Sequence, residues 1–296
     1  MKVKHSVSYY VYQVFNTLIL VLVTLSCIFP ILHVLSMSLS SSSAAMAGKV
    51  TFFPVDFSLA AYKYLIKKKD FFHSVSISGW RVLVGTIVNM ILIVITAYPL
   101  SRTTKQFPKR NVYMSFFALT MFIGGGLIPT YMVIKGLHLL DNFWVMILPG
   151  AMNIWNVIIM MNFIRGLPKA VEESAYLDGA DHWQTLFKVV LPMAKPAIAS
   201  LLLFCMIGHW NSWFDGMFYM NNPNHYPMAT YLATQIINNN QSMTNMTPEQ
   251  LALLSSLSEK TVRSAQLFIS VVPILIVYPF LQKYFVKGIT VGSVKE

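Results

Sequence analysis

Charged residues are scarce in this sequence: they make up 11% of its 296 residues, while hydrophobic residues make up 55%. A soluble domain carries about a quarter charged residues, so this scarcity indicates that lipid is the main solvent of the chain. Cysteine is almost absent as well, with two copies, Cys27 and Cys205, each inside an apolar stretch. We therefore expect buried thiols rather than a disulfide.

Acidic residues are few even among the charged ones, with 11 Asp and Glu against 22 Lys and Arg and a net charge of +11. A basic excess can indicate binding to nucleic acid. Here, however, the basic residues form no helical stripe and cluster at the ends of apolar runs, as membrane topology requires.

Catalytic motifs are missing. Gly124-Gly125-Gly126 is not followed by Lys-Ser or Lys-Thr at the spacing of a P-loop, so the chain alone is not expected to hydrolyse ATP. Glycines inside an apolar run instead favour a close helix approach or a bend. The histidines lack the spacing of metal ligands, and no nucleophile–base pattern occurs. We expect no enzyme activity, no metal and no bound cofactor.

Six apolar stretches are long enough to cross a bilayer, which requires about 20 residues in a helix. The first is uninterrupted by charge between His5 and Lys49, far longer than the apolar part of a signal peptide, so we expect an uncleaved span. The runs are continuous rather than alternating, which argues against transmembrane strands. We predict an all-α membrane protein that forms one transmembrane domain over residues 1–296, with spans at about 11–37, 82–101, 111–134, 142–164, 196–219 and 262–284.

The distribution of Lys and Arg predicts the orientation. An even number of spans puts both termini on one side, where the basic loops 102–110 and 165–195 also fall. The positive-inside rule therefore assigns both termini to the cytosol. The basic cluster 67–69 departs from the trend, but it lies in a long loop, where the rule is weak.

The loop 166–195 has the signals of two short helices. Pro168 suits the first turn of one helix, and Gly179 suits its C-terminal end. Asp181 and Gln184 form a capping box for a second helix. A capping box at 247–250 likewise predicts a helix start before the last span.

The second helix of this loop has an apolar pattern at helical spacing, formed by Trp183, Leu186, Phe187 and Val190. This pattern predicts one apolar face. Two interpretations are equally compatible with it: a hairpin lying on the membrane surface, or a rigid element that docks into the groove of a partner protein.

A spaced motif runs through the same loop: Glu173-Ser174-Ala175, then Gly179, Val189 and Leu191-Pro192. The motif resembles the cytosolic signature of the integral-membrane permease subunits of ABC importers, in their carbohydrate-uptake, maltose-type branch. Ser174 stands where the signature has alanine, a small change that still allows close packing. The segments 124–130, 210–211 and 286–295 are similar to the subgroup that imports polysaccharide-derived oligosaccharides in Gram-positive bacteria.

The resemblance implies a type I ABC importer permease fold in the cell membrane and a coupling helix in the loop 166–195. It also implies three kinds of partner: a second permease subunit, two copies of a cytosolic P-loop ATPase that uses ATP and Mg, and an extracellular solute-binding lipoprotein. The residues expected to couple to the ATPase are Glu172, Glu173, Ser174, Ala175, Asp178, Gly179, Ala180, Trp183, Phe187, Leu191 and Pro192.

Polar and aromatic residues in the spans are candidates for the sugar pathway, since amides and carboxylates bind hydroxyls and indoles pack on sugar rings. They are Asn89, Asn153, Asn156, Trp210, Asn211, Trp213, Asp215 and Tyr219. The alternative is structural, because Asn also bonds helices together and Trp and Tyr mark the membrane interface.

Other classes of membrane protein predict features that this sequence lacks. A secondary transporter driven by an ion gradient more often has repeated halves and buried ionisable groups at mid-membrane. A membrane enzyme needs a set of catalytic groups. A non-catalytic scaffold subunit is the remaining alternative.

Overall fold

The computed structural model describes residues 6–237 and 258–293, and this part of the chain is built of helices with no strand. The all-α prediction is therefore confirmed. The described residues fall into two compact units, one from residues 6–69 and 258–272 and the other from residues 70–237 and 273–293. The capping box predicted at 247–250 lies outside the described residues.

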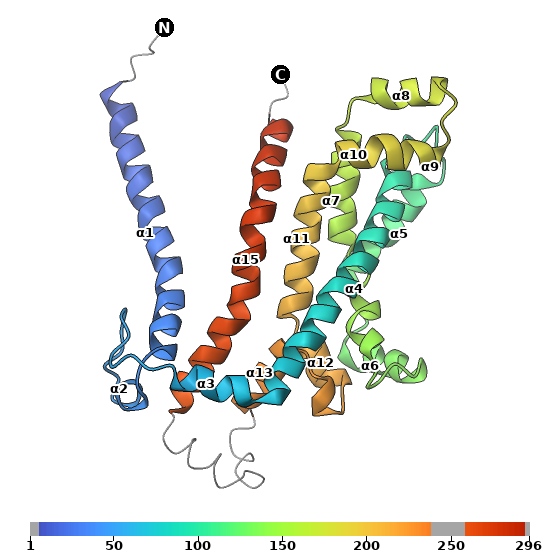
Figure 1. The fold of residues 1–296 in the computed structure, drawn as a ribbon. Coiled ribbons are helices and arrows are strands. Elements are labelled where there is room, and N and C mark those ends of the chain that lie inside the picture. The colour runs from blue at the N-terminus through green and yellow to red at the C-terminus, as the bar shows by residue number, and fades with distance from the viewer. Residues whose placement is uncertain (1–5, 238–257, 294–296) are drawn as a thin grey trace. The chain divides into compact units, whose positions relative to one another are not determined.

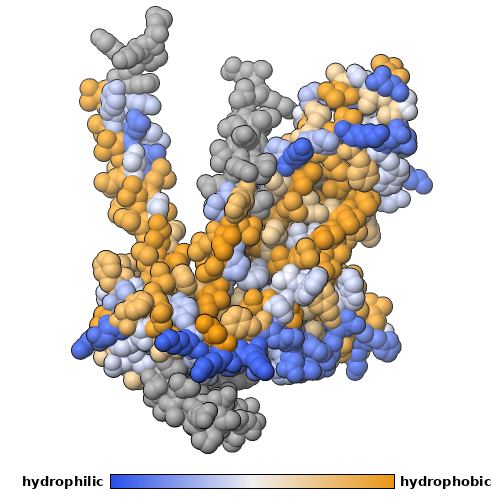
Figure 2. All heavy atoms as spheres, in the orientation of Figure 1, coloured by the Kyte–Doolittle hydropathy of each residue, from blue (hydrophilic) through white to orange (hydrophobic). Residues whose placement is uncertain are grey.

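The first unit contains α1 (Val7–Ser38), α2 (Ser42–Met46), α3 (Ala60–Lys67) and the start of α15 (Glu259–Ser293). The Ser6 side chain caps α1 by accepting from the Tyr9 N–H, and α3 packs against α15 through Leu65 and Ala265, which are fully buried. The apolar side chains of α1 are exposed along most of its length, as the spheres of Figure 2 show. Such a helix is solvated by lipid or by another membrane helix.

The two cysteines are free, but they differ in burial. Cys205 is buried as expected, whereas Cys27 is exposed on α1. The expectation was wrong for Cys27 because an apolar neighbourhood in the sequence indicates lipid or protein equally well.

The second unit is a helical bundle that holds the candidate sites. Its elements are α4 (Lys69–Ser101), α5 (Arg110–Phe122), α6 (Leu127–Gly136), η1 (Phe143–Met146), η2 (Leu148–Gly150), α7 (Ile154–Arg165), α8 (Lys169–Leu177), α9 (His182–Gln184), η3 (Thr185–Val190), α10 (Leu191–Met193), α11 (Lys195–Asn211), α12 (Phe214–Tyr219), η4 (Pro223–His225) and α13 (Met228–Ile237). Its core joins α4, α7 and α11 through buried side chains that include Ile93, Met160 and Leu201. The long helix α4 extends from the end of this bundle near α12 to the end near α8 and α9 (Figure 1).

Three described helices are long and apolar enough to cross a membrane: α1, α4 and the Glu259–Phe280 part of α15. Three further helix pairs pass the same test if each bent pair is one span, which gives up to six. The pair α5 and α6 is bent by 115°, at the predicted glycine run. Gly126 has a φ of +78° there, a conformation that glycine adopts at little cost.

The stretch predicted as a span at about 196–219 is not one helix. It ends as α11 at Asn211 and resumes as α12 at Phe214. The Thr230 hydroxyl of α13 donates to the carbonyl oxygen of Trp213 at 2.8 Å. A backbone carbonyl at this interruption therefore keeps a hydrogen-bond partner.

Candidate functional site

The loop 166–195 folds as two short helical segments joined at a glycine, as predicted. Gly179 has a φ of +82°, and the Ala180 N–H donates to the carbonyl oxygen of Ala175 at 2.9 Å, closing the end of α8. The Asp181 side chain accepts from the Gln184 N–H at 2.6 Å and completes the capping box of α9.

The four apolar residues of the second segment do not share one surface, and this part of the prediction is wrong. Leu186 and Val190 are 1% and 0% exposed and pack into the bundle core, whereas Trp183 and Phe187 are each 59% exposed. In η3, a π-helical turn, residues four apart stay on one side, as Trp183–Phe187 and Leu186–Val190 do, whereas residues three apart point to different sides. The Trp183 and Phe187 rings stack with centroids 6.1 Å apart and form an exposed aromatic pair.

The other predicted coupling residues vary in exposure. Glu173, Ser174, Asp178, Gly179 and Pro192 are exposed, Glu172, Ala180 and Leu191 are intermediate, and Ala175 is buried. The exposed members are therefore the ones available to a partner.

Glu172 is held within the bundle. Its carboxylate pairs with Arg102, the residue after α4, and the two side chains are 14% and 11% exposed. The Arg102 guanidinium also lies over the Tyr98 ring, 4.1 Å from its centroid. The sequence did not predict this contact, because the two partners are 70 positions apart.

A cavity of about 440 Å³ opens at the other end of the bundle. Five of the eight pathway candidates line it: Asn89, Asn153, Asn156, Asp215 and Tyr219. Trp210, Asn211 and Trp213 are not among its lining residues, although they belong to the same α11–α12 segment. The structure therefore brings together side chains from α4, α7 and α12.

The asparagines of the cavity differ in their contacts. Asn153 caps α7 by accepting from the Asn156 N–H at 3.2 Å, and the Asn156 amide lies 3.7 Å from the Cys205 sulfur. Asn89 is 6% exposed, and its Oδ1 has no hydrogen-bond partner within the described residues. A buried carbonyl oxygen without a partner is costly in free energy, so such an atom in a cavity wall indicates a polar ligand.

Arg81 is the main residue that the sequence analysis missed. It is 2% exposed, pairs with Asp215, and donates to the carbonyl oxygens of Ser212 at 3.0 Å and Met146 at 3.1 Å. Its Nε has no partner in the described part of the chain. Arg81 is charged and lies one residue before the predicted span 82–101, so the span prediction did not include it. Arg81 of α4 and the partly exposed Asp215 thus form an ionisable pair at the cavity wall that the sequence did not predict.

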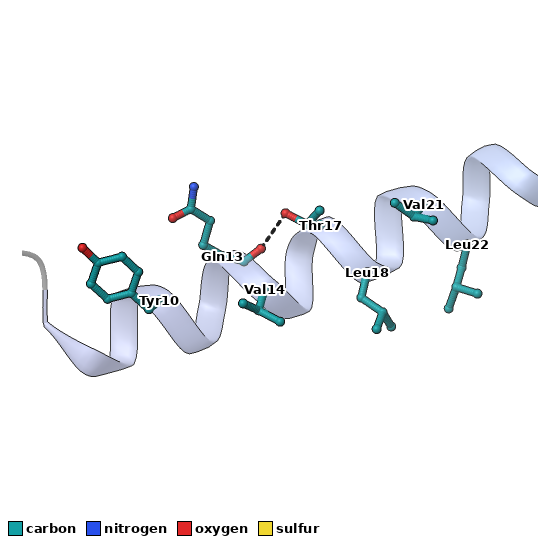
Figure 3. Close-up of a pocket in the computed structure, with 7 residues that line it drawn as sticks. All are labelled: Tyr10, Gln13, Val14, Thr17, Leu18, Val21 and Leu22. Atoms are coloured by element: carbon teal, nitrogen blue, oxygen red, sulfur yellow. Dashed lines mark hydrogen bonds between the residues drawn. The ribbon is translucent and has the colours of Figure 1, made fainter.

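A second hollow, of about 630 Å³, lies along α1 in the first unit (Figure 3). A single helix supplies its whole lining, which is Tyr10, Gln13, Val14, Thr17, Leu18, Val21 and Leu22. The Thr17 hydroxyl donates to the Gln13 carbonyl oxygen at 2.8 Å. The apolar surface of this helix suits lipid tails or another helix better than a sugar.

Comparison with known proteins identifies the family. Residues 82–291 match the model of the binding-protein-dependent transport system inner membrane component. The polygalacturonan/rhamnogalacturonan transport system permease protein YtcP of Bacillus subtilis is 36% identical over 276 residues, covering 93% of this chain and 95% of that protein. Protein LplC of the same organism is 36% identical over 285 residues, covering 96% and 95%.

A solved structure gives the same assignment. A chain from a bacterial ABC transporter involved in the import of the acidic polysaccharide alginate superposes with a TM-score of 0.85 and 34% identity, covering 95% of this chain and 99% of that one. The protein therefore belongs to the family of binding-protein-dependent transport system inner membrane components, and it is a non-catalytic permease subunit of an ABC importer with the type I fold.

Proposed function

We propose that this permease subunit helps to import an acidic oligosaccharide, and that the sugar passes the cavity of the second unit. The observation that carries the proposal is the presence of two buried polar atoms without hydrogen-bond partners in the described residues, Arg81 Nε and Asn89 Oδ1. Both residues line the same cavity. Sugar hydroxyls both donate and accept, so they match such a mixture of groups.

The acidic class is supported by the relatives. One is named for polygalacturonan and rhamnogalacturonan, and one is described as importing the acidic polysaccharide alginate. A uronate carboxylate accepts strong hydrogen bonds from a guanidinium, and the Arg81 guanidinium at the cavity wall keeps one N–H, at Nε, without a partner in the described residues.

The candidate pathway residues take different roles in this proposal. Asn89, Asn153, Asn156, Asp215 and Tyr219 contact the sugar in the cavity. The other three candidates lie where α11 ends and α12 begins: Trp210, Asn211 and Trp213. Trp213 is exposed and offers a ring face to an approaching sugar.

The loop 166–195 is the proposed contact with the ATPase. Its exposed Trp183–Phe187 pair has the character of an interface anchor, since large aromatic side chains dominate the binding energy of many interfaces. The complete importer in this proposal has a second permease subunit, two ATPase copies that use ATP and Mg, and an extracellular binding protein. Residues 1–296 form one permease domain in the membrane of a Gram-positive cell, with both termini in the cytosol.

Uptake by the reconstituted complex tests the proposal. Proteoliposomes containing this chain, its partner permease, the ATPase and the binding protein would be given labelled oligogalacturonate or a maltodextrin of equal length, with and without ATP. We expect uptake of the oligogalacturonate that requires ATP. Equal uptake of the neutral sugar would contradict the acidic class, and uptake on an ion gradient alone would contradict the ATP-driven mechanism.

A further inference from the structure

We infer that α4 transmits movement between the loop 166–195 and the cavity through two largely buried ion pairs, one just after its C-terminal end and the other in its N-terminal half. Arg102–Glu172 is the pair at the loop and Arg81–Asp215 is the pair at the cavity. The inference rests on the proposed function insofar as it takes the loop to be the ATPase contact.

At the loop, the end of α4 contacts α8 at two places. The residues of the two contacts are about one helical turn apart on each helix. Arg102 pairs with Glu172, and the Tyr98 hydroxyl lies 3.4 Å from the Tyr176 hydroxyl. The Tyr176 hydroxyl in turn lies 3.1 Å from His182 Nδ1 at the start of α9. Residues four apart lie on the same side of a helix, so these pairs fasten one side of α8 to one side of the α4 end.

Neighbouring carboxylates in α8 therefore have different surroundings. Glu172 is 14% exposed and points to Arg102, whereas Glu173 is exposed. The first fastens the loop to the bundle, and the second remains available to a partner protein.

At the cavity, Arg81 holds two other segments to α4. Besides its pair with Asp215 near the start of α12, it donates to the carbonyl oxygens of Met146 in η1 and Ser212 after α11. A shift of α4 along or about its axis must therefore move the rim of the cavity or break these bonds.

The helix between the two pairs suits transmission. Arg81 and Tyr98 are separated by about 26 Å along α4, close to the hydrocarbon thickness of a bilayer, which is about 30 Å. The intervening residues Ile93 and Ala97 are fully buried in the core with α7 and α11. Close-packed helices shift as bodies rather than deforming continuously, so displacement at one end reaches the other.

The test measures coupling rather than folding. Ser76 on α4 and Asn224 in η4 are both exposed, and each would be changed to cysteine and spin-labelled in a Cys27→Ser background. The distance between the labels would be compared in the complete complex with and without nucleotide trapped in the ATPase. We expect trapping to change this distance in the parent complex.

Arg102→Gln is expected to abolish the distance change and to lower the sugar imported per ATP hydrolysed at least about tenfold, a coupling loss of ~1.4 kcal/mol. Lys105→Gln is the matched control. Lys105 is exposed and lies with Arg102 between α4 and α5, so this variant removes the same charge and is expected to behave like the parent. The double variant Arg102→Glu, Glu172→Arg is expected to restore both readouts, because it rebuilds the pair.

Two results would overturn the inference: an unchanged distance response in Arg102→Gln, or no recovery in the charge-swapped double variant of a complex that assembles. Failure of the proposed function is recognised separately, in the parent complex. It would appear as no association of the loop with the ATPase, or as no uptake of acidic sugar while the distance response persists.

Discussion

Gly85 of α4 lies so close to His209 of α11 that a Cβ atom at Gly85 would be 2.5 Å from the imidazole ring. His209 lines the cavity, so the absence of a side chain at Gly85 sets how closely α4 approaches α11 beside the proposed sugar path. A Cβ atom built at Gly79, six residues earlier on the same helix, meets no heavy atom within 4 Å beyond its own stretch of helix.

The change Gly85→Ala is therefore expected to displace His209 or α4, lowering both thermal stability and sugar uptake. An overpacked buried site typically costs about 1–3 kcal/mol. Gly79→Ala is the matched control and is expected to be neutral or to stabilise by up to about 1 kcal/mol, because alanine favours helix. Thermal unfolding and uptake by the two variants check this. Equal behaviour would show that the close approach has no consequence.

The Arg81–Asp215 pair is expected to contribute both to stability and to sugar uptake, and two variants separate these contributions. Asp215→Asn leaves the Arg81 charge without its partner, a change that typically costs about 3–5 kcal/mol at a buried site. The double variant Arg81→Met, Asp215→Leu removes both charges and is expected to recover much of the stability without recovering uptake. Unfolding in detergent and uptake in proteoliposomes distinguish the two effects. Full uptake by the double variant would exclude a role for Arg81 in transport.

Leu186 and Trp183, three positions apart, are expected to respond in opposite ways to alanine. Leu186→Ala removes a core side chain that is 1% exposed and is expected to destabilise the protein by about 2–5 kcal/mol. Trp183→Ala changes an exposed ring and is expected to leave stability nearly unchanged while weakening ATPase association by about 2 kcal/mol or more. Co-purification and thermal unfolding measure both quantities. Undiminished association of the Trp183 variant would argue against the aromatic anchor.

These residues show what the sequence can predict and what it cannot. Local signals predicted the turn at Gly179 and the cap at Asp181 because each depends on neighbours within a few positions. The division of the apolar stripe depends on a π-helical turn, which helical spacing does not reveal. The pairs of Arg81 and Arg102 join residues 134 and 70 positions apart, so their geometry emerges only from the fold. Within the cavity, residue type selected five lining residues and also three that lie outside the lining.

The stability of the contact between Asp141 and the segment 221–225 is expected to depend on pH. Its Oδ1 accepts from the Asn222 and Asn221 N–H groups at 3.2 and 3.1 Å and lies 3.2 Å from His225 Nδ1. Desolvation raises the pKa of Asp141, but the Asn222 N–H, His225 and the Asn221 N–H together lower it below its ordinary value. A carboxyl with a lowered pKa stabilises the fold above the unfolded pKa of about 4, and that stabilisation is lost as the pH falls through the folded value.

Asp141→Asn is the matched variant, because Asp141 has a φ of +54° and asparagine also tolerates this conformation. We expect the stability difference between the two proteins to shrink as the pH falls below about 4. Thermal unfolding across this range measures it. A difference that does not change with pH would contradict the role of the carboxylate.

The most direct test of the account is sugar uptake by the Asn89→Leu complex. Leucine replaces the unpartnered amide oxygen with a group of similar size and leaves the loop 166–195 intact. We expect ATP hydrolysis still to respond to the binding protein while uptake of oligogalacturonate falls about tenfold, the effect of losing roughly one hydrogen bond to the sugar. Unchanged uptake, with ATP hydrolysis intact, would contradict the claim that the sugar passes this cavity.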